Sequence, residues 1–150
     1  MPTHYQGTPD EVRALEAFIK LVRATETLNA RLQTSLAEEG LTPGQLAVLE
    51  ALLHLGPMCQ RALGRKVLRS DANVTTVLDN LERSGFIRRA RSVEDRRLVN
   101  VELSQTGRAR IEGIFPGHAR RIAEGLSCLS AAEQKELARL CKKLGLSLAE

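Results

Sequence analysis

The chain is poor in aromatic residues: its 150 residues include no tryptophan, one tyrosine and three phenylalanines. A hydrophobic core must therefore consist mainly of leucine, valine, isoleucine and alanine, which suits a largely helical protein. The shortage also disfavours a protein that binds single-stranded nucleic acid, because such proteins stack bases on exposed aromatic side chains.

Long apolar segments are also missing. No apolar run approaches the ~20 residues that a helix needs to cross a bilayer. The N-terminal residues lack the basic and then apolar order of a secretory signal. These two absences predict a cytoplasmic protein that has no membrane partner.

The three cysteines, Cys59, Cys128 and Cys141, are odd in number and widely spaced. They form neither a disulfide framework nor the ligand spacing of a zinc site, so no metal is expected. The first interpretation is that they are small apolar side chains. The alternative is a redox role, for which Cys59 is the candidate because Arg61 follows closely and positive charge favours the reactive thiolate.

Signals of catalysis are absent as well. The three histidines have no acid or nucleophile at a telling spacing, and the chain has no glycine-rich phosphate loop. We therefore expect no catalytic residue and no cofactor, and the protein is not predicted to be an enzyme.

Positive charge is concentrated in one short segment. Residues 83–97 contain six arginines and two acidic residues, and this local excess of four equals the formal charge of +4 of the whole chain. A cationic segment beside a helix can hold a phosphate backbone, so double-stranded DNA is the predicted partner. A solubilising charged turn is the alternative, which six arginines without a lysine disfavour.

Helix-start signals divide the chain into six predicted helices. Thr8, Thr42 and Ser130 each begin a capping box, and proline follows the first two. Apolar residues at helical spacing follow each start. The predicted helices cover about 8–38, 42–54, 60–68, 71–84, 104–126 (kinked at Pro116) and 130–145, where Gly145 is the predicted stop.

Two strands are predicted over 86–91 and 98–103, joined by a charged turn. Two short helices followed by a hairpin form a winged helix. The predicted fold is therefore mainly α (an α+β winged helix), with six helices and a short β-hairpin wing. The helix over 8–38 would be about 45 Å long at 1.5 Å per residue, so part of its apolar stripe needs a second copy of the chain to cover it.

The predicted helix over 71–84 has one apolar stripe and one polar face. The stripe consists of Val74, Val77, Leu78 and Leu81. Polar side chains opposite the stripe can reach base edges when the helix end enters the major groove. A solvated face is the alternative, and the neighbouring cationic hairpin favours DNA. The polar side chains opposite the stripe are Asp71, Asn73, Thr75, Thr76, Asp79, Asn80 and Arg83.

The charged turn is predicted to project as a wing. An arginine at its tip suits the narrow minor groove, where negative potential concentrates. Asp95 is expected to pair with either Arg89 or Arg97 and so to fix the shape of the wing. The predicted DNA-binding residues of the wing are Arg89, Arg91, Arg96 and Arg97.

Three short motifs in this region resemble the signature of MarR-type transcriptional regulators: Leu-Glu-x-x-Gly from Leu81, Asp-Arg-Arg from Asp95, and Leu-Ser-x-x-Gly from Leu103. The resemblance spans about residues 10–145. It implies a single MarR-type domain over 1–150, with dimerisation helices at 8–38 and 104–145 and a winged-helix DNA-binding lobe at 42–103. It also implies an obligate homodimer on a palindromic site, whose first and last two helices interlock, with Arg97 as the minor-groove residue and Arg96 beside it. The residues that the resemblance places at recognition-helix positions are Asp71, Asn73, Thr75, Thr76 and Asn80.

The resemblance further implies regulation by a ligand. Many regulators of this type are released from DNA by small, often aromatic acids, so we expect a repressor with a small aromatic or anionic effector. Candidate pocket residues are Arg23, His54 and His118, and a solvated or interface role is the alternative for each. Two other functions stay open: a regulator of the same fold switched by cysteine oxidation, and a winged-helix protein-interaction module without DNA affinity.

Overall fold

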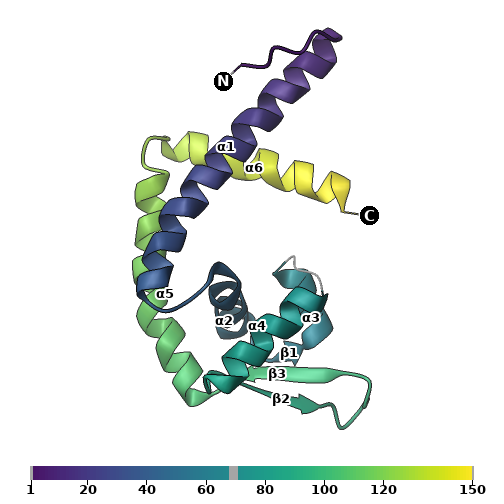
Figure 1. Cartoon of the computed structure of the whole chain (residues 1–150), viewed down its shortest axis with the longest axis vertical. Helices are drawn as coiled ribbons and strands as arrows, with labels where there is room; N and C mark the ends of the chain where they lie inside the picture. Colours follow the sequence, from purple (N-terminus) through teal and green to yellow (C-terminus); the bar gives the residue numbers. More distant parts are fainter. Residues whose placement is uncertain (1, 68–70, 150) are drawn as a thin grey trace. The chain divides into compact units, whose positions relative to one another are not determined.

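The computed structural model describes residues 2–67 and 71–149, except the side chains of residues 71 and 72. Over these residues the chain forms six helices and a three-stranded antiparallel sheet (Figure 1), which confirms the mainly α winged-helix architecture. The predicted turn at 68–70 lies outside the described residues. None of the described helices is long and apolar enough to cross a membrane.

The elements follow the predicted order. The helices are α1 (Pro9–Glu38), α2 (Pro43–Leu55), α3 (Gln60–Lys66), α4 (Asp71–Arg83), α5 (Gln105–Gly125) and α6 (Ala131–Leu148). The strands are β1 (Met58–Cys59), β2 (Ile87–Arg91) and β3 (Val99–Leu103). The predicted end of the last helix at Gly145 is wrong, because α6 continues through it. A glycine costs a helix about 1 kcal/mol relative to alanine, which weakens the helix without ending it.

The predicted capping boxes are confirmed at the starts of α1, α2 and α6. Thr8, Thr42 and Ser130 each accept a hydrogen bond of 3.2 Å from the backbone N–H three residues further on. Cys59 occupies the same position before α3, and its thiol accepts no cap hydrogen bond from the described part of that helix. The start of α3 is therefore held less well than the starts of the other three.

The sheet has the strand order β1-β3-β2. Strand β1 was not predicted, because its two residues are too few to show an alternating pattern. It pairs with β3 through Met58 opposite Val101 and Cys59 opposite Asn100. This pairing attaches the segment just before α3 to the hairpin. The start of α3 and the wing are therefore joined through one sheet.

The hydrophobic core is aliphatic, as the composition predicts. It takes leucine, valine and isoleucine side chains from the end of α1, the loop at Leu41, α2, α3, α4, β2, β3 and the first half of α5. Within the stripe of α4, Val74, Leu78 and Leu81 are at most 1% exposed and Val77 is half-buried. The buried stripe fixes which face of α4 points to solvent.

The chain divides into two compact units, residues 1–116 and 117–150. The boundary falls at Pro116, inside α5. The first unit holds α1 to β3 and the first half of α5. In the second unit α6 exposes three leucines at helical spacing, Leu137, Leu140 and Leu144, each between 39% and 48% exposed in the single chain.

Candidate nucleic-acid interface

The face of α4 opposite its buried stripe carries the predicted recognition residues. Asn73, Thr75 and Thr76 are exposed there. Gln60 Nε2 of α3 donates a hydrogen bond to Thr75 Oγ1 at 3.1 Å, a link between the two helices that sequence reasoning missed. Asn80 is half-buried and accepts a hydrogen bond from Arg83 Nη1 at 3.1 Å. The side chain of Asp71 lies outside the described residues.

The turn between β2 and β3 is held by local hydrogen bonds. Ser92 is buried, and its Oγ accepts from the backbone N–H groups of Glu94 and Asp95 at 3.2 and 3.3 Å. Leu98 closes the turn by donating its N–H to the Asp95 carbonyl at 3.0 Å. Sequence reasoning missed Ser92, although a serine whose hydroxyl can accept a hydrogen bond from the backbone N–H two residues further on is a known turn signal. Hydrogen bonds within the turn itself therefore define its shape.

Of the two partners considered for Asp95, the structure has Arg97. Asp95 Oδ1 accepts from the backbone N–H and from Nε of Arg97 at 3.0 and 3.1 Å, and Oδ2 accepts from Nη2 at 3.1 Å. These hydrogen bonds from Arg97 lower the pKa of the Asp95 carboxyl below its ordinary value. The Arg97 side chain is still 89% exposed, so the pair orients the guanidinium without burying it.

The other arginines of the turn are exposed as well. Arg91 Nη1 donates a hydrogen bond of 2.9 Å to the Arg96 carbonyl, so one guanidinium spans the turn from its first strand. Arg96 is exposed beside Arg97. Arg91 at the end of β2 and Arg96 and Arg97 in the turn thus expose three guanidinium groups at the tip of the hairpin.

Arg89 differs from these three. Its side chain is 19% exposed, and Nη2 lies 2.6 Å from Asp79 Oδ1 and 3.0 Å from Glu82 Oε1, both on α4. The predicted wing residues therefore separate into an exposed group and one arginine held against the neighbouring helix.

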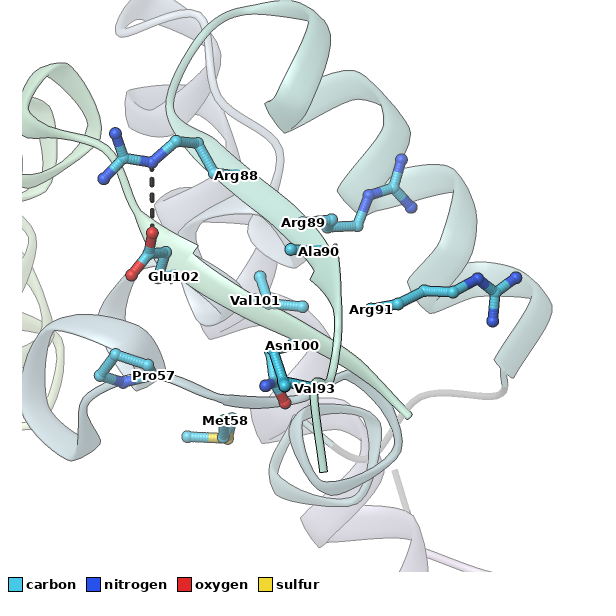
Figure 2. Close-up of a pocket in the computed structure, with 10 residues that line it drawn as sticks. All are labelled: Pro57, Met58, Arg88, Arg89, Ala90, Arg91, Val93, Asn100, Val101 and Glu102. Carbon is cyan, nitrogen blue, oxygen red and sulfur yellow. Dashed lines mark ion pairs between the residues drawn. The ribbon is translucent and has the colours of Figure 1, made fainter. Parts of the chain in front are cut away.

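The outer face of the sheet carries a further ion pair. Arg88 and Arg89 leave β2 on opposite sides (Figure 2), as alternation along a strand requires. Arg88 Nε lies 3.3 Å from Glu102 Oε1 on β3. The two residues border an open hollow of about 410 Å³ that also contacts Ala90 and the 98% exposed Val93. The pair places one positive and one negative charge side by side, so this face is less cationic than the turn.

The base of the wing is joined to α4 and α5 at three residues. Gly85 has φ +79°, which confirms the predicted left-handed end of α4. Ser104 Oγ donates to the Gly85 carbonyl at 2.5 Å and accepts from the Gly107 N–H at 3.0 Å. A Cβ at Gly107 would overlap the Phe86 carbonyl. The motif Leu-Ser-x-x-Gly thus serves to start α5 close against the end of α4.

The candidate effector residues lie on three different helices. Arg23 is exposed on α1. His54, in the last turn of α2, has its ring 5.3 Å from that of Phe115 in an edge-to-face contact, and its Nδ1 lies 3.9 Å from Glu50 Oε1. His118 is 8% exposed on α5.

A residue that sequence reasoning missed, Arg110, lines a second hollow beside the first half of α5. The hollow measures about 430 Å³ and includes Phe86 and Ile114 in its wall. Arg110 donates to the Glu39 carbonyl, and its Nη1 lies 3.9 Å from Glu39 Oε2. A cation beside apolar walls matches the chemistry of a small aromatic acid. In the sequence, nothing distinguished Arg110 from the other arginines of the same helix.

No cluster of three or more histidine, cysteine or acidic side chains suited to a metal ion occurs among the described residues. The three cysteines are free; Cys59 is half-buried and the other two are exposed. The redox role considered for Cys59 stays a prediction.

Comparisons with known proteins agree on the class of protein. The MarR family model matches residues 41–99. The HTH-type transcriptional regulator YkoM of Bacillus subtilis is 37% identical over 134 residues, which cover 89% of this chain and 87% of that protein. The regulator MhqR of the same species is 33% identical over 135 residues, covering 90% and 93%. The structure of Bordetella bronchiseptica BpsR, whose DNA binding is regulated by 6-hydroxynicotinic acid, is 26% identical with a TM-score of 0.79, covering 86% of this chain and 98% of BpsR.

Proposed function

Because the chain belongs to the MarR family of DNA-binding transcriptional regulators, we propose that it acts as a homodimeric repressor on a palindromic duplex site. In this proposal each copy inserts the polar face of α4 into a major groove and the tip of the wing into the adjacent minor groove. A small aromatic or anionic effector then lowers the affinity for DNA.

One observation carries the DNA-binding geometry: exposed arginines stand in an ordered turn within the same compact unit as the polar face of α4. Arg97 is 89% exposed and oriented by Asp95, and α4 packs against β2 at the base of the wing. Guanidinium groups that are already oriented lose little side-chain entropy when they meet phosphate or a narrow minor groove. Both elements are therefore ready to bind one duplex.

The homodimer is supported by apolar side chains that the single chain leaves in solvent. Phe18 on α1 is 61% exposed, and Leu140 and Leu144 on α6 are each 48% exposed. Leucines at helical spacing on one face are typical of helix–helix contact between copies. A two-fold axis through such a contact gives the two recognition helices the symmetry of a palindrome.

The test combines selection of duplexes from a random pool with a dimer variant. The wild-type chain should select a palindrome. Leu140→Asp buries a charge at the contact and should give a monomer with at least a tenfold loss in affinity, because a buried unpaired charge costs several kcal/mol. Sedimentation and binding isotherms measure the two effects.

The matched control is Lys142→Asp, which adds a carboxylate to the same helix on a different face. It should leave the protein dimeric. Selection of asymmetric sites, or a monomeric wild-type chain with full affinity, would contradict the homodimer.

The effector is supported by the chemistry of the hollow around Arg110 and by the ligand that regulates BpsR. A ligand releases DNA by as much as it prefers the conformation that binds DNA poorly. Titration of small aromatic carboxylates, including 6-hydroxynicotinic acid, into the protein–DNA complex should release the duplex. Arg110→Gln should raise the required concentration by about tenfold, the loss of one charge-assisted hydrogen bond.

Arg108→Gln is the matched control, since Arg108 is exposed two residues earlier on the same helix. It should leave the required concentration unchanged. Release that is equally efficient from both variants would remove Arg110 from the effector site.

A further inference from the structure

Arg89 joins the wing to the recognition helix through three donated hydrogen bonds. Its Nη2 donates to Asp79 Oδ1 at 2.6 Å and to Glu82 Oε1 at 3.0 Å. Its backbone N–H donates to Glu82 Oε2 at 3.1 Å. Glu82 therefore holds both the main chain and the side chain of one β2 residue, which fixes the strand against α4 in both position and direction.

The charges in this cluster explain why the contact is close. Asp79 and Glu82 are three residues apart on α4, so their carboxylates are neighbours on one helix face and repel each other. The Arg89 guanidinium between them compensates both. The hydrogen bonds that Arg89 donates lower the pKa of the Glu82 carboxyl below its ordinary value, and the same hydrogen bonds to Glu82 and Asp79 raise the pKa of Arg89.

The same geometry withholds Arg89 from a phosphate. Its side chain is 19% exposed, against 89% for Arg97. To reach DNA, Arg89 would have to leave two carboxylates that would then face the polyanion unpaired. In the described contacts, Arg91, Arg96 and Arg97 form no ion pair with an acidic residue of α4.

We propose that Arg89 is a positioning residue of the DNA-binding surface: by bridging Asp79 and Glu82 it sets the placement of the wing relative to α4, and it does not itself contact DNA. The inference rests on the proposed use of α4 and the wing on one duplex. The role expected for Arg89 thus changes from contacting DNA to holding the wing in place against α4.

The first experiment compares the salt dependence of Arg89→Gln and Arg96→Gln on the selected duplex. Each phosphate contact that is lost makes the slope of log K against log salt less negative by about 0.9. Arg96→Gln should show such a change. Arg89→Gln should lower the affinity by about tenfold, the effect of losing a charge-assisted hydrogen bond, with the slope of the wild-type chain.

The second experiment exchanges the charges. Arg89→Glu alone places three carboxylates together and should lose more affinity than Arg89→Gln. Adding Glu82→Arg restores an ion pair across the same gap and should recover most of the affinity, because the pair and not the arginine at position 89 is what matters. Arg89→Lys keeps the charge, but its ammonium sits on a shorter side chain of different shape and cannot take the position of Nη2 between the two acids, so it should fall between Arg89→Gln and the wild-type chain.

Thermal unfolding of every variant is measured beside the binding, and affinities are compared at a temperature where each is folded. An unchanged affinity for Arg89→Gln, a slope change equal to that of Arg96→Gln, or no recovery in the exchanged pair would each overturn the positioning role. If the wild-type chain binds no duplex, the proposed function fails first, and that outcome is separate from the three above.

Discussion

Replacing Gly107 with alanine is expected to destabilise the fold by about 3 kcal/mol, the upper range for overpacking a close contact. The added Cβ would overlap the Phe86 carbonyl, which is backbone and cannot rotate away. The first turn of α5 would have to move away from Phe86, and the Ser104 hydrogen bonds to Gly85 and Gly107 would lengthen with it. Urea unfolding followed by circular dichroism measures the change.

Gly113 provides the control within the same helix. A Cβ there meets nothing within 4 Å among the described residues, and the backbone is helical. Gly113→Ala should therefore stabilise the chain by up to about 1 kcal/mol through helix propensity alone. Equal effects of the two substitutions would show that Gly107 is not required by close packing.

Removing Arg96 and Arg97 together is expected to weaken DNA binding more than any other change in the wing. If both contact phosphate, the slope of log K against log salt becomes less negative by about 1.8, and affinity at moderate salt falls by roughly a hundredfold. The Arg97 substitution also releases Asp95, whose carboxylate then faces the duplex without a partner. Binding isotherms of the Arg96→Ala, Arg97→Ala double variant at several salt concentrations measure both quantities.

Arg13→Ala serves as the control for general charge. Arg13 is exposed at the start of α1 and pairs with Asp10 at 2.5 Å, far along the sequence from the wing. It should leave both the slope and the affinity near those of the wild-type chain. A double variant that behaves like Arg13→Ala would place the DNA contacts elsewhere.

The sequence predicted well those features that depend on neighbours along the chain. The three capping boxes each need only four consecutive residues, and all three are present. Gly85 ends α4 with the expected positive φ for the same reason. The buried stripe of α4 follows from its period alone. These features are local, so a linear pattern contains the information that determines them.

Features that depend on contacts between segments were predicted poorly. Strand β1 forms because Met58 and Cys59 pair with residues of β3. Two residues are too few to show a pattern that would predict this pairing. Arg89 was grouped with the wing arginines because composition counts charges without showing what faces them. The available hint was the pair Asp79 and Glu82, three residues apart on the polar side of α4. Two acids on one helix face repel each other unless a cation lies between them, and Arg89 of β2 is that cation.

The junction at Ser104 has a mechanical consequence. The Ser104 hydroxyl donates to the Gly85 carbonyl, just beyond α4, and accepts from the Gly107 N–H in the first turn of α5. Because Gly107 has no side chain, its backbone can lie directly against the Phe86 carbonyl. Because no side chain lies between the Gly107 backbone and the Phe86 carbonyl, a rotation of the first turn of α5 would have to move the segment that follows α4 with it. In the proposed function, a ligand that shifts the first turn of α5 would therefore change the placement of α4 without repacking the leucine core.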